Sequence, residues 1–209
     1  MDVIKKYFPG LSPWQLEKFE MMWSLYREWN QKVNLISRKD MEFFYLRHVL
    51  YSLAVARVVH FKPGASILDL GTGGGFPGIP LAIYFPSSRF MLVDSVGKKI
   101  RVIHDLIGRL GLKNVHAVQS RGERVDLLFD FVTGRAVKSL NTFMGWAGSK
   151  ISPEHRHDLP NGVLYLKGGD LEQELSGLSS FNSKVYPLSD FFHEPFFETK
   201  KLVHLYREH

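Results

Sequence analysis

From residue 65 onward, short apolar runs alternate with longer segments whose apolar positions recur every three or four residues. The short runs predict strands and the longer segments predict helices. Such alternation is typical of an α/β protein, with a mainly parallel sheet and helices on both faces. The predicted strands cover residues 66–70, 89–93, 114–118, 128–133 and 162–167. The predicted helices cover residues 77–84, 96–110 and 139–147.

The last third of the chain has a different pattern. Residues 184–187 and 200–206 have the composition of strands, and no helical pattern lies between them. The intervening residues 188–198 are expected to form an apolar loop, and residues 148–161 an exposed loop with two prolines. Two strands without a helix between them predict a closing hairpin, so one strand of the sheet should be antiparallel to the others.

The N-terminal part of the chain predicts helices. Residues 12–30 form one of them, because Ser12 can cap it and Pro13 suits its first turn. Its apolar stripe, which we expect to pack in the core, contains Leu16, Phe19, Met22 or Trp23, Tyr26 and Trp29. A second helix is predicted over residues 40–59, with Asp40 as its cap.

Composition and length favour one compact protein of 209 residues, 44% of them hydrophobic. We expect residues 1–62 to be a helical extension packed on a core of residues 63–209. The chain has no cysteine, no apolar run long enough to span a membrane and no secretion signal at its start. These features favour a cytoplasmic protein, and the lack of an obvious exposed apolar helix favours a monomer.

The net charge of +6 suggests a polyanionic partner. Basic residues concentrate between residues 95 and 124, where seven of them accompany only two acids. The seven are Lys98, Lys99, Arg101, Arg109, Lys113, Arg121 and Arg124. Each could simply belong to a solvated helix face, but together they predict a rim that faces nucleic acid.

A glycine-rich turn follows the first predicted strand, and it carries the strongest chemical signal. Four glycines occupy five positions there, at Gly71, Gly73, Gly74 and Gly75. Glycine lets the backbone adopt positive φ angles and approach a ligand closely. Pro77 then suits the first turn of a helix, whose free N–H groups attract an anionic group. The turn therefore predicts a nucleotide-like cofactor, the alternative being a tight turn without a ligand.

The spacing of these glycines bears on which nucleotide binds. Gly73, Gly75 and Gly78 match the dinucleotide pattern G-x-G-x-x-G, but that pattern should begin at the strand end, where Gly71 stands. With Asp69, the sequence reads D-x-G-x-G-x-G, which resembles motif I of class I S-adenosylmethionine (SAM)-dependent methyltransferases. A carboxylate at this place suits a cationic sulfonium better than a pyrophosphate.

Further candidates stand at the ends of the other strands, where open α/β sheets bind ligands. Asp94 can accept hydrogen bonds from ribose hydroxyls or cap the next helix, and Gly122 can lie against an adenine ring or form an ordinary turn. Arg135 can bind a carboxylate or phosphate with two N–H groups. Lys167 ends the fifth strand beside the same crevice.

Residues 69–82, Asp-Leu-Gly-Thr-Gly-Gly-Gly-Phe-Pro-Gly-Ile-Pro-Leu-Ala, resemble the signature of the GidB/RsmG family. The resemblance continues over residues 25–170. Its other marks are Trp29-Asn30, Val33-Asn34-Leu35, Arg47-His48, Leu92-Val93-Asp94-Ser95, Lys98-Lys99, Arg121-Gly122-Glu123, Thr133-Gly134-Arg135-Ala136 and Lys167-Gly168. The resemblance implies a class I methyltransferase fold, a Rossmann-like seven-stranded sheet. It also implies an enzyme that uses SAM to methylate nitrogen 7 of a guanine in bacterial 16S ribosomal RNA of the small subunit.

The same resemblance implies roles for individual residues. With the acids and glycines above, the expected cofactor-binding residues are Asp69, Gly71, Gly73, Gly75, Phe76, Asp94, Gly122, Glu123 and Arg135. Those expected to line the target pocket are Asn34, His48, Arg135 and Lys167. Three positions depart from the family pattern, since Tyr51 replaces an Asp, Gly122 a small apolar residue and Gly134 a Ser.

The chemistry of this reaction requires neither a general base nor a metal. Guanine nitrogen 7 carries an in-plane lone pair, so positioning and electrostatics suffice. His155 and His157 share a predicted loop but have no third ligand at metal spacing. Two other functions stay open, a methyltransferase for a small molecule or protein, and a non-catalytic RNA-binding module with a vestigial pocket.

Overall fold

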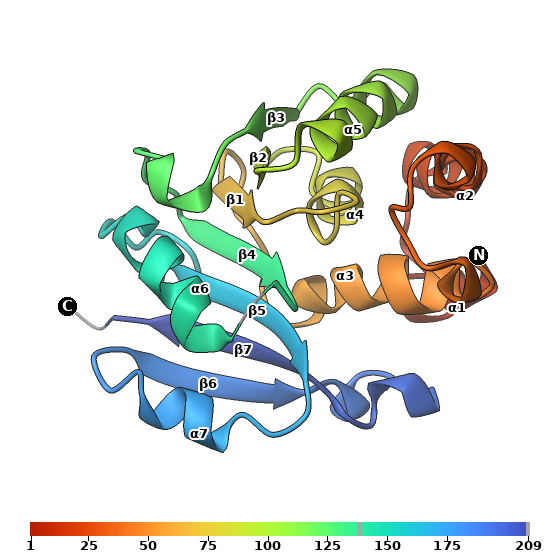
Figure 1. Ribbon diagram of the computed structural model, residues 1–209. Helices are drawn as coiled ribbons and strands as arrows, with labels where there is room; N and C mark the ends of the chain where they lie inside the picture. The colour runs from red at the N-terminus through yellow and green to blue at the C-terminus, as the bar shows by residue number, and fades with distance from the viewer. Residues whose placement is uncertain (138, 208–209) are drawn as a thin grey trace.

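Seven strands form one sheet in the order β3-β2-β1-β4-β5-β7-β6 (Figure 1). The computed structural model describes residues 1–137 and 139–207. Six strands run in one direction, and β7 pairs antiparallel with both β5 and β6. The strands are β1 (Ser66–Leu70), β2 (Arg89–Asp94), β3 (Val115–Gln119), β4 (Phe131–Arg135), β5 (Gly162–Gly168), β6 (Asn182–Pro187) and β7 (Lys200–Tyr206). The predicted parallel sheet with a closing antiparallel hairpin is therefore confirmed.

Apolar side chains alternate between two cores, one on each face of the sheet. On β1, Ile67 joins the larger core, whereas Leu68 and Leu70 join the smaller one. The larger core is covered by α1 (Asp2–Tyr7), α2 (Pro13–Lys32), α3 (Tyr51–Leu53), α4 (Gly78–Tyr84) and α5 (Gly97–Leu110). The smaller core lies under α6 (Leu140–Ala147) and α7 (Glu172–Ser176), on the other side of the sheet (Figure 1).

The N-terminal helix α2 begins as predicted. Ser12 accepts a hydrogen bond from the N–H of Gln15, and the Gln15 side chain accepts one from the N–H of Ser12. In the apolar stripe of α2, Met22 is fully buried and Trp23 is 38% exposed, which settles the alternative between them. The stripe packs in the same core as the sheet.

The prediction of one regular helix over residues 40–59 is wrong. The structure has a 3-10 turn at Arg38–Asp40, a π-helix at Phe44–Leu50, the short α3 and a second 3-10 turn at Ala54–Arg57. Ser37, not Asp40, caps the first turn, because its hydroxyl accepts the N–H of Asp40. A π-helix adds a residue to each turn, and the spacing of apolar residues does not distinguish it from an α-helix.

The expectation of an exposed loop over residues 148–161 is also wrong in part. Lys150 and Asn161 are buried, and Ile151 forms a bridge with Phe129. The cause is the buried carboxylate of Asp130, which accepts a hydrogen bond from Arg156 at 2.8 Å and fixes this segment against the sheet.

Smaller differences concern where elements begin. Strand β4 starts three residues later than predicted, because Leu128 is 58% exposed and lies outside the sheet. Helix α4 starts at Gly78, after Pro77, which follows a cis peptide bond. Residues 188–198 form two 3-10 turns, at Leu188–Asp190 and Pro195–Phe197.

Candidate active site

The glycine-rich turn after β1 is held from behind by Asp69. One carboxylate oxygen of this fully buried residue accepts the hydroxyl of Thr72 at 2.6 Å and the N–H of Gly78 at 2.8 Å. The other oxygen is buried and has no partner among the described residues. Burial raises the pKa of Asp69 to about 6, so the carboxylate is still mostly ionised at neutral pH. Asp69 therefore shapes the turn and does not line the cavity beside it.

The glycines of the turn divide into two groups. Gly71 and Gly73 line the cavity, and both have positive φ angles. Gly75 also has a positive φ, of 90°, but it faces the core, where an added Cβ would lie 2.5 Å from the Ile79 side chain. Phe76 is buried as well, between Tyr26 and Arg135. The predicted cofactor-binding residues thus include some that face the cavity and some that support the turn.

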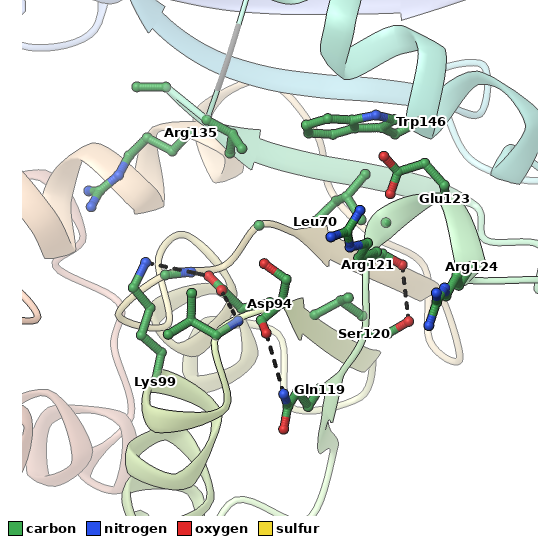
Figure 2. Close-up of a pocket in the computed structure, with 18 residues that line it drawn as sticks. Leu70, Asp94, Lys99, Gln119, Ser120, Arg121, Glu123, Arg124, Arg135 and Trp146 are labelled. Atoms are coloured by element: carbon green, nitrogen blue, oxygen red, sulfur yellow. Dashed lines mark hydrogen bonds and ion pairs between the residues drawn. The ribbon is translucent and has the colours of Figure 1, made fainter.

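The cavity has a volume of about 920 Å³ and opens at the carboxyl ends of β1 to β4 (Figure 2). Six of the predicted site residues line it. They are Gly71, Gly73, Asp94, Gly122, Glu123 and Arg135. Small-molecule sites commonly have volumes of roughly 300–1,000 Å³, so the cavity is large enough for a nucleotide-sized ligand.

Asp94 joins the first two strands at the floor of the cavity. Its carboxylate accepts the N–H of Gly73 and the N–H of Val96, both at 2.9 Å, and Lys99 lies 3.7 Å away (Figure 2). Asp94 does not cap α5 as the alternative expected, because the N-cap residue is Val96 and, at the start of this helix, Asp94 bonds only the N–H of that residue. Asp94 does lie on the cavity wall.

At the far end of the cavity, Gly122 and Glu123 form a 3-10 turn after β3. An added Cβ on Gly122 would lie 2.9 Å from the end of the Leu70 side chain, which would have to move to make room for it. Trp146 lies over this end, facing Glu123 (Figure 2). Sequence reasoning missed Trp146, because it looked for ligand contacts at strand ends and this residue comes from α6.

Arg135, at the end of β4, forms the other end of the cavity. One guanidinium nitrogen lies 3.1 Å from His48 Nδ1, and another donates to the carbonyl of Arg47 at 3.3 Å. The guanidinium also lies over the rings of Phe76 and Tyr51, with its carbon 4.9 and 5.8 Å from their centroids. Within residues 1–137 and 139–207, no carboxylate pairs with it at 4 Å or less. Burial lowers the pKa of Arg135, but a guanidinium stays charged. The site therefore contains a cation without a direct ion-pair partner, on which the carboxylates of Asp69 and Asp40 act only from a longer distance.

His48 is neutral and has a defined tautomer. Burial and the charge of Arg135 lower the pKa of His48 to about 3. Because a guanidinium can only donate, Nδ1 of His48 must accept, and we assign the ring proton to Nε2. That Nε2 atom is buried and without a partner in the described part of the chain. His48 consequently offers one N–H donor and no base of ordinary strength.

The other two residues of the predicted target pocket lie apart from this pair. Asn34 is exposed in the segment after α2, which Asn30 fixes by accepting the N–H groups of Leu35 and Ile36. Lys167, near the end of β5, forms an ion pair with Glu174 of α7. The structure thus brings together His48 and Arg135, and the roles of Asn34 and Lys167 stay predictions.

The predicted basic rim is divided by the fold. Arg121 and Arg124 line the cavity, and Lys98 and Lys99 stand in the first turn of α5 beside it. Arg109 lies at the opposite end of this helix, about 18 Å away along its axis, and is paired with Glu28 and Asp105. Arg109 is therefore separated from the basic residues at the cavity.

Neither histidine of the 148–161 segment is placed as a metal ligand. His155 accepts the N–H of Asn161, and His157 accepts the N–H of Lys62. Across the described residues, no group of three His, Asp or Glu could hold a metal ion. Within the same residues, no helix has the length and apolar character needed to cross a bilayer.

Replacing Asp69 with Ala should lower the free energy of unfolding by about 2–4 kcal/mol, because two buried donors lose their acceptor. Asp69→Asn should cost less, since its amide keeps one acceptor oxygen. Urea denaturation measures both, with Asp126→Ala as the exposed control. Equal stability of Asp69→Ala and the control would contradict the role assigned to this carboxylate.

His48 should make stability depend on pH. Its folded-state pKa is lowered to about 3, so the unfolded chain binds an extra proton between that value and about 6.5. The stability that His48 contributes is therefore present above pH 6.5 and is lost as the pH falls toward 3. The difference in unfolding free energy between wild type and His48→Gln should shrink from pH 7 to pH 5. A constant difference, as expected for Ser24→Ala, would mean that His48 titrates normally.

Comparison with known proteins identifies the family. A model described as GidB, rRNA small subunit methyltransferase G, matches residues 15–189. The ribosomal RNA small subunit methyltransferase G of Flavobacterium johnsoniae is 51% identical over 205 residues, covering 98% of this chain and 97% of that protein.

Solved structures share the fold at low identity, which confirms the predicted class I methyltransferase architecture. A precorrin-6y C5,15-methyltransferase from Geobacter metallireducens is 12% identical, with a TM-score of 0.57 over 83% of this chain and 91% of that one. A variant of MtNAS in complex with S-adenosylmethionine is 15% identical, with a TM-score of 0.60 over 93% of this chain and 76% of that one. With a family model matched over residues 15–189 and a relative that aligns along nearly its whole length, the chain belongs to the GidB family of small-subunit ribosomal RNA methyltransferases.

Proposed function

We propose that this protein transfers a methyl group from SAM to nitrogen 7 of a guanine in 16S ribosomal RNA. Membership of the GidB family carries this proposal, because a relative named for this RNA substrate matches the chain almost from end to end. The cavity at the carboxyl ends of the parallel strands supports it, since this is where such sheets bind ligands.

The residues around the cavity fit SAM. The absence of side chains on Gly71 and Gly73 leaves its floor open, and the Asp94 carboxylate faces it as an acceptor for ribose hydroxyls. Gly122 and Trp146 offer flat apolar surfaces at the far end, suited to an adenine ring. When bound, SAM supplies an electrophilic methyl group on a sulfonium. We assign the support of this site to the buried residues Asp69, Gly75 and Phe76, and a place at its rim to Glu123.

The other end of the cavity suits a reaction without proton abstraction. His48 is too weak a base to take a proton near neutral pH, and Arg135 can only donate hydrogen bonds. A guanine nitrogen with a free lone pair needs neither to remove a proton. These two residues would orient the guanine and exclude water from the site. Arg135 would also attract a carboxylate or phosphate. We also assign Asn34 and Lys167 to the proposed target pocket, on the resemblance to the family alone.

The substrate also bears on location and assembly. An enzyme that acts on bacterial ribosomal RNA works in the cytoplasm, and we propose this location for the protein. We further propose that it acts as a monomer, since one chain contains the complete cavity.

Methyl transfer from labelled SAM to 16S ribosomal RNA that lacks the modification tests the proposal directly. The label should map to nitrogen 7 of one guanine. Arg135→Ala should reduce transfer by about 100-fold, because a preorganised donor is lost, while the protein stays folded. Arg89→Ala, at the start of β2 and the opposite edge of the sheet, serves as the control. Label on a protein or a small molecule but not on RNA would refute the assignment.

A further inference from the structure

Beside Arg135, four residues from two distant parts of the chain form a surface of alternating rings and cations. We name it the Phe43–Lys200 patch, and it consists of Phe43, Arg47, Phe196 and Lys200. The Arg47 guanidinium carbon lies 4.0 Å from the centre of the Phe43 ring and 5.9 Å from that of Phe196. Lys200 Nζ lies 5.0 Å from the centre of the Phe196 ring. Each cation thus lies against an aromatic ring.

The patch is exposed to solvent, and Lys200 has no ion-pair partner within the described residues. Phe43 is 42% exposed, which is unusual for a ring that could pack in a core, and the Arg47 side chain is 36% exposed. Asp40 pairs with one terminal nitrogen of Arg47, and Nε of Arg47 is buried without a partner among the described residues, so it is not available to a ligand at the surface. Lys200 forms no ion pair within 4 Å in that same part of the chain. The nearest acids in sequence, Glu42 and Glu198, are exposed.

The patch is continuous with the cavity. The carbonyl of Arg47 accepts a hydrogen bond from Arg135, which lines the cavity. The ring of Tyr51 lies between Arg135 and Phe196, 5.8 Å from the guanidinium and 5.5 Å from the second ring. Figure 1 shows the segment after β6 reaching the same end of the sheet as the helices before β1. A strand that enters the cavity at Arg135 would therefore cross this patch.

We propose that the Phe43–Lys200 patch binds the single-stranded RNA next to the target guanine, with a base stacked on Phe43 and phosphates held by Arg47 and Lys200. This inference rests on the proposed function. Exposed rings stack unpaired bases and neighbouring cations bind the backbone, which is the combination that single-stranded nucleic acid requires. An acidic protein segment would use the cations but would leave the exposed Phe43 ring without a matching group.

This location differs from the rim expected between residues 95 and 124. Lys99 already faces Asp94, and Arg109 is paired with two acids. The first turn of α5 and Arg135 both border the cavity, whereas the patch adjoins the cavity only through Arg135 and Tyr51. Because the two sets share no residue, substitutions can test them separately.

The test compares Phe43→Ala, Lys200→Gln and their combination with wild type. Lys200→Gln removes the charge and the contact of the ammonium group with the Phe196 ring, and it leaves a shorter, neutral polar side chain. Binding of naked 16S ribosomal RNA should weaken about tenfold for the double variant, and the salt dependence of binding should fall by about one phosphate contact for Lys200→Gln. Phe43→Trp should restore binding, because a larger ring still stacks.

A matched control exists on α2, where Trp23 is 38% exposed and Arg27 lies 5.0 Å from its ring. Trp23→Ala with Arg27→Gln removes an aromatic–cation pair of the same kind elsewhere and should leave RNA affinity unchanged. SAM affinity, measured by calorimetry, should stay within twofold of wild type in every variant.

Direct binding separates this inference from the proposed function. Unchanged RNA affinity and salt dependence in the double variant, with SAM still bound, would overturn the patch while leaving the methyltransferase assignment intact. Equal losses in the patch variant and in the α2 control would also overturn it, because the effect would then be general charge. Failure of the wild-type protein to methylate RNA would instead contradict the proposed function.

Discussion

The buried carboxylate of Asp69 determines the shape on which the cavity depends. It joins the end of β1, the hydroxyl of Thr72 and the first residue of α4 through one oxygen atom. A charge in this position is costly, and burial raises the pKa of Asp69 accordingly. Two hydrogen bonds and the start of a helix compensate for it. With the turn fixed from behind, Gly71 and Gly73 can present bare backbone to the cavity.

At the Arg135 end of the cavity, a cation is surrounded by neutral groups to which it donates hydrogen bonds. Arg135 has no acidic partner in the described chain, and its neighbours are a neutral imidazole, a carbonyl and two rings. The neighbouring Tyr51 contributes a ring and no carboxylate, so no counter-charge is in direct contact with the guanidinium within the described residues. An anionic ligand could supply one on binding.

Local sequence signals predicted most of the fold. Apolar runs located the strands of the parallel sheet, and glycine spacing located the turn, because both depend on neighbours in the sequence. Features that depend on contacts between residues far apart in the sequence were not predicted. The π-helix at Phe44–Leu50 sets the register of Arg47 and His48, the Asp130 carboxylate orders residues 148–161, and Trp146 reaches the cavity from a helix. Likewise, Lys167 was correctly predicted near the end of the fifth strand, but its ion pair with Glu174 was not predicted.

One hydrogen bond carries a consequence for how the N-terminal helices are regarded. The Tyr26 hydroxyl on α2 donates to the carbonyl of Gly74 at 2.7 Å, inside the glycine-rich turn, and both residues are buried. An added methyl at Gly75 would also meet that hydroxyl. Helix α2 therefore packs against the back of the glycine-rich turn. A fragment that began at residue 63 would lack this contact and would expose the buried side of the turn to water. The N-terminal helices are therefore needed for the shape of the cavity.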